Sequence, residues 1–127
     1  MTTTLQTIHD VPVLMCAPEG ETIARESDAL DLIGNAGYQG AAWVVIPVER
    51  FDEAFFQLRT RAAGDIIQKF VQYSVGLAVI GDISRHTTAS SSLRDFVREC
   101  NRNRQTWFLA DLDELRERLQ GSRSHHG

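Results

Sequence analysis

The polar segment at residues 81–92 carries the side chains best suited to chemistry. Its sequence, GDISRHTTASSS, contains a carboxylate at Asp82 and an imidazole at His86. A carboxylate can orient an imidazole, and an imidazole exchanges protons near neutral pH, so these two residues form a candidate acid–base pair for catalysis. The hydroxyl groups that could bind a ligand beside this pair are those of Ser84, Ser91 and Ser92. The last two precede a predicted helix, whose N-terminus would favour an anion.

The same segment also has a purely structural interpretation. In that interpretation, Asp82 caps a turn and His86 lies on a loop. An α/β hydrolase would carry its nucleophile in a G-x-S-x-G turn, and the sequence contains no such turn. Both interpretations stay open at the level of the sequence.

Two further polar clusters could contribute to a ligand site. Asn35 and Tyr38 lie in a glycine-rich stretch, where the backbone could approach a ligand closely. The alternative for this stretch is a helix end that uses glycine to turn the chain. The second cluster contains Arg94, Glu99, Asn101 and Arg104. Arg104 is a candidate ligand residue, and solvated surface charge is the alternative for this cluster.

The sequence contains none of the motifs that bind common cofactors. It has no G-x-x-x-x-G-K loop, no G-x-G-x-x-G turn and no H-E-x-x-H pair. We therefore expect no nucleotide, flavin or metal cofactor. The formal net charge of −4 disfavours binding to nucleic acids and to anionic membranes, because both require a basic surface.

The cysteine content and hydropathy pattern predict a cytoplasmic protein. Cys16 and Cys100 both lie among apolar residues and form no zinc-binding spacing, so we expect buried free thiols in a reducing compartment. No apolar run approaches the roughly 18 residues that a membrane span requires. The first ten residues lack the basic start and apolar run of a signal peptide.

The hydrophobic pattern predicts five strands and four helices. The strands are expected at residues 4–8, 11–17, 42–48, 75–80 and 106–110. We expect Ser27 to cap the first helix and the glycines at 34, 37 and 40 to end it. The second helix is expected to be the longest, at residues 53–73, with Asp52 as its cap. Ser92 and Asp111 are expected to cap the third and fourth helices.

This order of elements predicts an α/β fold with a single mixed sheet. After an N-terminal hairpin that turns at His9 and Asp10, strands alternate with helices, which favours parallel pairing. We expect one domain at residues 1–127, with an ordered core at about 4–120 and a polar tail at 121–127. Ligands favour the crevice at the carboxyl ends of parallel strands. We expect residues 47–52, 81–92 and 110–113 to converge there.

Several motifs along the chain, in the right order, are typical of one protein family. The motifs are DLIGN at 31–35, YQG at 38–40, FFQLRT at 55–60, AGDIIQKF at 63–70, GDIS at 81–84 and LRDF at 93–96, followed by Glu99, Asn101 and Arg104. Together they resemble a bacterial family known only as domain of unknown function 4180, over roughly residues 10–119. Asp65 stands where that family usually carries Glu. The family has no known activity, so the resemblance implies membership and no mechanism.

The element order alone is similar to the fold of the anti-sigma-factor antagonists, called STAS-like. In that group, members that switch partners are phosphorylated on a serine at the start of the helix after the central strand. The corresponding stretch here is ERFD at residues 49–52, which contains no serine or threonine. The resemblance therefore implies a related architecture without that phosphorylation switch.

Two functional hypotheses of different classes follow from the sequence. The first is a non-catalytic regulatory module of STAS-like architecture that binds a small molecule or a protein partner. The second is a cofactor-independent enzyme, an isomerase, lyase or hydrolase of a small metabolite, that uses Asp82 and His86. A homodimer is a further expectation, because two chains could bury Trp43, Phe51 and Trp107 between them.

Overall fold

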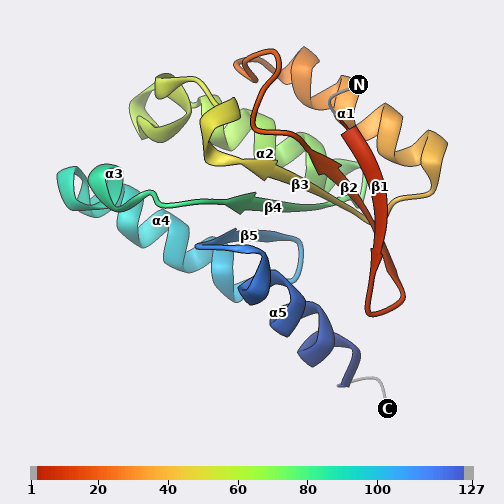
Figure 1. Cartoon of the computed structure of the whole chain (residues 1–127). Helices are drawn as coiled ribbons and strands as arrows, with labels where there is room; N and C mark the ends of the chain where they lie inside the picture. Colours follow the sequence, from red (N-terminus) through yellow and green to blue (C-terminus); the bar gives the residue numbers. More distant parts are fainter. Residues whose placement is uncertain (1–2, 125–127) are drawn as a thin grey trace.

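A five-stranded mixed sheet forms the centre of the fold (Figure 1). The computed structural model describes residues 3–124. The strands are β1 (Thr3–Ile8), β2 (Val11–Cys16), β3 (Trp43–Pro47), β4 (Gly76–Ile80) and β5 (Thr106–Leu109), and they lie in the sheet in this order. β1 pairs antiparallel with β2, and the remaining neighbours pair in parallel. The predicted α/β class and single mixed sheet are confirmed.

Within residues 3–124, five α-helices and three short 3₁₀ turns connect and follow the strands. The helices are α1 (Glu26–Gln39), α2 (Ala62–Gln72), α3 (Ser84–Ala89), α4 (Ser91–Arg102) and α5 (Leu112–Ser124). The 3₁₀ turns are η1 (Val48–Arg50), η2 (Glu53–Phe56) and η3 (Leu58–Thr60). The order of the strands and long helices is consistent with the STAS-like order. The short helix α3 lies where the sequence predicted an irregular polar loop.

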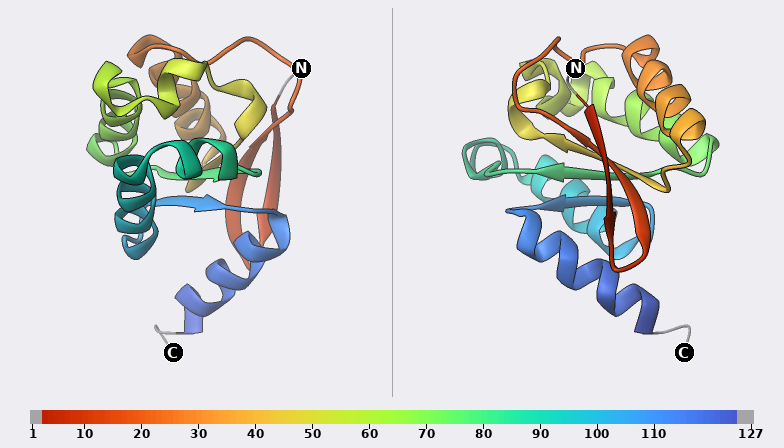
Figure 2. Two further views of the ribbon diagram at one scale, coloured as in Figure 1. Left: turned by 90° about the vertical axis from the view of Figure 1, so that its left-hand side faces the viewer. Right: turned by 45° about the vertical axis from the view of Figure 1, so that its right-hand side comes forward.

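The larger hydrophobic core lies between the sheet and the helices α1, α2 and α4, which cover one face (Figure 2). Leu14, Val44 and Leu77 are among its fully buried strand residues, and Ile66 and Phe70 of α2 belong to the same core. Each strand presents alternate side chains to this face, as the pleat requires.

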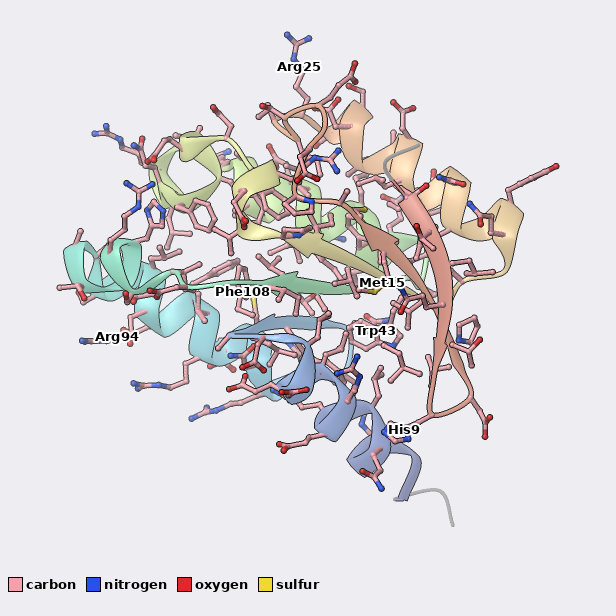
Figure 3. All side chains as sticks on the ribbon, viewed as in Figure 1. His9, Met15, Arg25, Trp43, Arg94 and Phe108 are labelled. Carbon is pink, nitrogen blue, oxygen red and sulfur yellow. The ribbon has the colours of Figure 1, made fainter. Side chains whose placement is uncertain are left out.

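The opposite face of the sheet is covered by α5. Leu115 and Leu119 of this helix pack on an aromatic pair, Trp43 and Trp107, whose ring centroids are 4.3 Å apart. Figure 3 shows Trp43 on the side of the sheet that faces α5. Trp43, Phe51 and Trp107 are only 8%, 7% and 4% exposed. The argument that these aromatic residues would be buried between two chains is therefore wrong, because a single chain already buries them.

The continuous helix expected at residues 53–73 is replaced by two 3₁₀ turns and the shorter helix α2. Arg61 interrupts the segment, because its φ of 64° lies in the left-handed region and cannot continue a helix. The apolar residues that suggested one helix are nevertheless buried on the same side, from Phe55 and Phe56 in η2 to Ile66 in α2. The spacing of the apolar residues thus predicted which side of the segment is buried, but it did not predict the interruption at Arg61.

Three helix boundaries differ from their predicted positions. The N-terminal cap of α1 is Arg25 rather than Ser27, and the Asp28 carboxylate accepts the Arg25 N–H at 3.0 Å. The α1 helix continues through Gly34 and Gly37, so of the three glycines only Gly40, in the left-handed conformation, ends it. The cap of α4 is Ser90 rather than Ser92, because its hydroxyl accepts the Leu93 N–H at 3.2 Å.

The cap of α5 and the state of both cysteines agree with the sequence. Asp111 accepts the Glu114 N–H at 3.0 Å, and Cys16 and Cys100 are buried free thiols. The α5 helix extends to Ser124, beyond the expected end of the ordered core at residue 120, and residues 125–127 of the expected tail lie outside the described residues. Among residues 3–124, no helix is both long and apolar enough to cross a bilayer.

Candidate functional site

A crevice of about 620 Å³ opens at the carboxyl ends of β3 and β4. In Figure 1 these strand ends point to the left, where α3 follows β4. The crevice is lined by Val48, Glu49, Phe51, Glu53, Phe56, Gly81, Asp82, Arg85 and His86. Two of the three segments expected to converge here, 47–52 and 81–92, do meet in this crevice.

Two contacts join η2 to α3 across the crevice. The His86 imidazole stacks on the Phe56 ring, with centroids 4.2 Å apart and planes inclined by 11°. Beside this stack, Arg85 Nη2 lies 2.6 Å from Glu53 Oε1. Both partners of the ion pair are largely exposed, so solvent screens their attraction. The ring stack on the buried Phe56 is therefore the contact that positions His86.

The Asp82 carboxylate is engaged by the backbone of α3. Its Oδ1 accepts the Ser84 N–H at 2.8 Å, and this hydrogen bond, with one from the Ser84 side chain, lowers the pKa of Asp82. Among the described residues, no hydrogen bond joins Asp82 to His86. The Asp82 carboxylate thus supports the turn that leads into α3, whose N-cap is Ile83. A catalytic role for the pair stays a prediction.

A second hollow of about 660 Å³ lies on the other side of the ring stack. It shares Glu53, Phe56 and His86 with the crevice, so these residues form the wall between the two hollows. Its other lining residues are Gln57, Leu58, Arg59, Ala89, Ser90 and Ser92. Ser92 therefore lies near His86 as predicted, whereas the neighbouring Ser91 lines neither hollow.

A third hollow is lined in part by the remaining segment expected at this edge, residues 110–113. Ser84 and Arg94 line it together with Ala110, which follows β5. The hollow also contains Gly81 and Asp82, so it borders the crevice along the loop after β4. The carboxyl ends of β4 and β5 thus border a series of hollows around the loop after β4.

Three candidate ligand residues lie away from this series of hollows. Asn35 is in the middle of α1, where its Nδ2 donates to Thr3 Oγ1 at 3.3 Å. Tyr38, near the end of the same helix, is 92% exposed. Arg104 precedes β5 and lines a separate hollow with Gln105 and Thr106. The structure therefore does not bring these residues together with Asp82 and His86.

The crevice residues that were not named as site residues from the sequence include Glu49, Glu53, Phe56 and Arg85. Glu49 belongs to the segment 47–52, which the sequence placed at this edge without naming Glu49 as a site residue. Phe56 was assigned to the buried face of a helix, and its ring is indeed buried. Only its contact with His86, 30 positions later, makes it part of the site.

Negative charge predominates in the crevice. Its lining includes the carboxylates of Glu49, Glu53 and Asp82, against the single guanidinium of Arg85. Arg85 pairs with Glu53, which leaves Glu49 and Asp82 without a cationic partner among the ion pairs of the described residues. The carboxylates are too dispersed to chelate, since no three His, Cys, Asp or Glu side chains of the described residues are placed to hold a metal ion. The local field favours a cation with hydrogen-bond donors.

A buried arginine supports the wall of the crevice from behind. Arg50 in η1 is 6% exposed, and it donates from Nε to the Glu21 carbonyl and from Nη1 to the Ala17 carbonyl, both at 2.9 Å. These bonds fix the loop between β2 and α1 against η1. The adjacent Phe51 is thereby held where it lines the crevice.

A comparison with protein-family models finds one match over most of the chain. The model described as "Domain of unknown function (DUF4180)" matches residues 8–119. Neither the curated proteins nor the solved structures contain a match.

Proposed function

The chain belongs to the family described as "Domain of unknown function (DUF4180)", and we propose that it is a non-catalytic module that binds a small cationic molecule in the crevice between η2 and α3. The single observation that supports this proposal most is the composition of the crevice wall. An aromatic stack of Phe56 and His86 lies beside three carboxylates and one guanidinium. Binding sites of this kind combine an apolar contact surface with a few polar groups that select charge.

The ligand class follows from the chemistry of that wall. A planar or compact cation can lie against an aromatic face and gain a cation–π contribution. Glu49 and Asp82 would then accept hydrogen bonds from its donor groups, because neither carboxylate forms an ion pair with an arginine or a lysine of the described residues. Occupancy of the crevice would couple η2 to α3, and this coupling gives the module its regulatory output.

The engagement of Asp82 supports a binding role over a catalytic one. A general base must reach the proton that it removes, and the group that orients it must be free to do so. Asp82 is held by Ser84 at the start of α3, and His86 is held by its stack on Phe56. For the enzyme hypothesis, Asp82 and His86 would have to form a hydrogen bond that the described residues do not contain.

The test is a titration of the ¹⁵N-labelled protein with a library of small amines, guanidines and planar cations. We expect at least one compound to shift the amide resonances of Gly81, Asp82 and His86. The substitution Glu49→Gln should weaken that compound about tenfold, because it removes one unpaired charge from the wall. Asp95→Asn is the matched control, since Asp95 is an exposed carboxylate on α4 that lines none of the hollows.

The outcomes separate the hypotheses. If no cation in the library perturbs the crevice, or if Asp95→Asn weakens binding as much as Glu49→Gln, the proposed site is wrong. Chemical conversion of a bound compound, abolished by His86→Ala, would establish the enzyme hypothesis in its place.

A further inference from the structure

The outer edge of β1 is an open hydrogen-bonding surface. Among the described residues, β1 lies at one end of the sheet and only β2 pairs with it. Figure 1 draws β1 as the strand at the end of the sheet beyond β2. The strand sequence TTLQTI contains no charge and no proline. It therefore lacks the residues with which edge strands usually resist pairing with a second chain.

The turn of the hairpin determines which backbone groups face outward. His9 and Asp10 have φ values of 50° and 68°, as a two-residue turn between antiparallel strands requires. Such a turn is closed by a hydrogen-bonded pair, here Ile8 and Val11, and bonded pairs then alternate along the strands. The N–H and C=O groups of Thr4 and Gln6 consequently face β2. The groups that face away from the sheet are those of Thr3, Leu5 and Thr7.

The side chains of the same strand add an apolar residue to this edge. Leu5 is 42% exposed, an unusual state for a leucine in a strand whose partner Leu14 is fully buried. Its side chain lies on the face covered by α1, because it is paired with Leu14 of the larger core. A second strand laid along β1 would cover this exposed leucine.

We propose that the outer edge of β1 binds a second copy of this chain, strand to strand and antiparallel, so that two sheets join across a two-fold axis at Leu5. Residues on the same face must pair, and only a register centred on Leu5 uses every outward group. In this register Leu5 pairs with Leu5 of the second copy, and Thr3 pairs with Thr7. Three N–H groups from each copy, those of Thr3, Leu5 and Thr7, then find a carbonyl in the other copy. The surface is self-complementary, as a two-fold interface requires.

The opposite end of the sheet supports the choice of β1. The edge of β5 is blocked, because the Asn101 side chain accepts the Phe108 N–H at 2.6 Å and donates to the Phe108 carbonyl at 3.1 Å. Of the two edge strands, only β1 is therefore open to a second copy, so β1 of one copy pairs with β1 of the other. This inference is independent of the crevice and of the function proposed for it.

The first experiment measures self-association by sedimentation velocity over about a hundredfold range of concentration. We expect a monomer–dimer equilibrium in the wild type. Leu5→Lys should raise the dissociation constant at least about tenfold, because it places two like charges opposite each other at the axis. The matched control is Leu30→Lys, the same change at an α1 residue that is 38% exposed, and it should leave the dimer unchanged.

The second experiment tests the register with disulfides. In the proposed register Thr4 lies opposite Gln6 of the second copy in a non-hydrogen-bonded pair, where the side chains approach within reach of a disulfide. Thr4→Cys/Gln6→Cys should therefore form a covalent dimer on mild oxidation, whereas either single variant should not. A wild type that is monomeric at all concentrations would overturn the proposal. So would cross-linking of Gln6→Cys alone, or a dimer that Leu5→Lys leaves intact.

Discussion

The two edge strands of the sheet, β1 and β5, differ in how their outward backbone groups are paired. Every edge strand leaves backbone N–H and C=O groups without a strand partner. At β5 the amide of Asn101 supplies both a donor and an acceptor to Phe108, and thus imitates one residue of a missing strand. At β1 no side chain of the described residues forms such a pair with the outward groups of Thr3, Leu5 and Thr7.

The surroundings of Asn101 show that the β5 edge is closed by a connected set of contacts. Arg118 of α5 donates to the Asn101 carbonyl at 2.6 Å and lies over the Trp107 ring, 4.4 Å from its centroid. The Trp107 indole N–H in turn donates to the Asn103 carbonyl at 2.7 Å. The closed edge therefore depends on α4, β5 and α5 together, whereas the open edge is a hairpin. The proposed strand pairing at β1 depends on this difference between the two edges.

The largest effect should come from removing the amide that closes β5. Asn101→Ala leaves both backbone groups of Phe108 without a partner in a half-buried place, so we expect a loss of about 2–3 kcal/mol in the free energy of unfolding. Urea denaturation measures it. The control is Asn103→Ala, because the Asn103 side chain is exposed and makes only one long hydrogen bond, of 3.5 Å, to the Glu99 carbonyl. Equal losses in the two variants would contradict a specific role for Asn101.

The next effect tests whether the sheet is as tightly packed toward β5 as the closed edge implies. The six-membered ring of Trp43 rests directly on Gly76, so that an added methyl group would overlap it. We expect Gly76→Ala to destabilise the protein by about 2 kcal/mol through overpacking. Thermal unfolding measures the change.

The matched substitution should act in the opposite direction. An added methyl group at Gly34, in the interior of α1, meets no atom within 4 Å. Gly34→Ala should therefore stabilise the helix by about 0.5–1 kcal/mol. A stabilising Gly76→Ala would show that the Trp43 and Trp107 pair moves freely, contrary to the packing described.

The sequence predicted the strands of the sheet better than it predicted the side-chain contacts at the sheet edges. Every strand end was predicted to within one residue. For β3, β4 and β5 the reason is that burial on two faces leaves a continuous apolar run. Asn101 was noticed in a polar cluster and in a family-like motif, and its role at the β5 edge was not predicted, since an amide that pairs with a strand edge has no local sequence signal. Its partner Phe108 is seven residues away, across a turn.

The sequence predicted where the candidate site lies better than it predicted which residues line it. The rule that parallel strands end at a common edge placed Asp82, His86 and the residues after β3 in one crevice. The expected helix at residues 53–73 concealed that Glu53 and Phe56 line the same space, because a break at Arg61 depends on a single positive φ. The direction in which the Asp82 side chain points could not be predicted from the sequence either. Whether Asp82 faces His86 or Ser84 is decided by the start of α3, a helix that the sequence did not predict.

A smaller effect compares the two thiols, one beside each edge. Cys16 on β2 pairs with Thr3 of the open strand, and Cys100 lies in α4 next to Asn101. Burial raises the pKa of each thiol to about 11. A pKa raised in the folded state means that the protonated thiols contribute stability below their ordinary pKa, and that this contribution is lost as the pH rises toward 11.

We therefore expect each thiol to account for a loss of about 1 kcal/mol in the free energy of unfolding between about pH 8 and about pH 9.5. Urea denaturation at both pH values measures this loss, and Cys16→Ala and Cys100→Ala should each remove one thiol's share of it. If β1 separated readily from β2, Cys16 would be solvated and its share would vanish. Equal shares would show that the open edge belongs to a strand as firmly held as the closed one.

Leu5→Lys should have the smallest effect on the free energy of unfolding of the isolated chain. It is also the most direct test of the difference between the β1 edge and the β5 edge. In dilute solution it should change the free energy of unfolding by less than about 0.5 kcal/mol, because Leu5 is partly exposed and its outward backbone groups have no partner to lose. At high concentration the wild type should gain stability by mass action, since only the folded state presents a paired edge. Its melting temperature should then rise with concentration, while that of Leu5→Lys stays constant. A variant that is unstable even when dilute would mean that Leu5 supports the hairpin itself, and the contrast between a structural edge and an associating edge would fail.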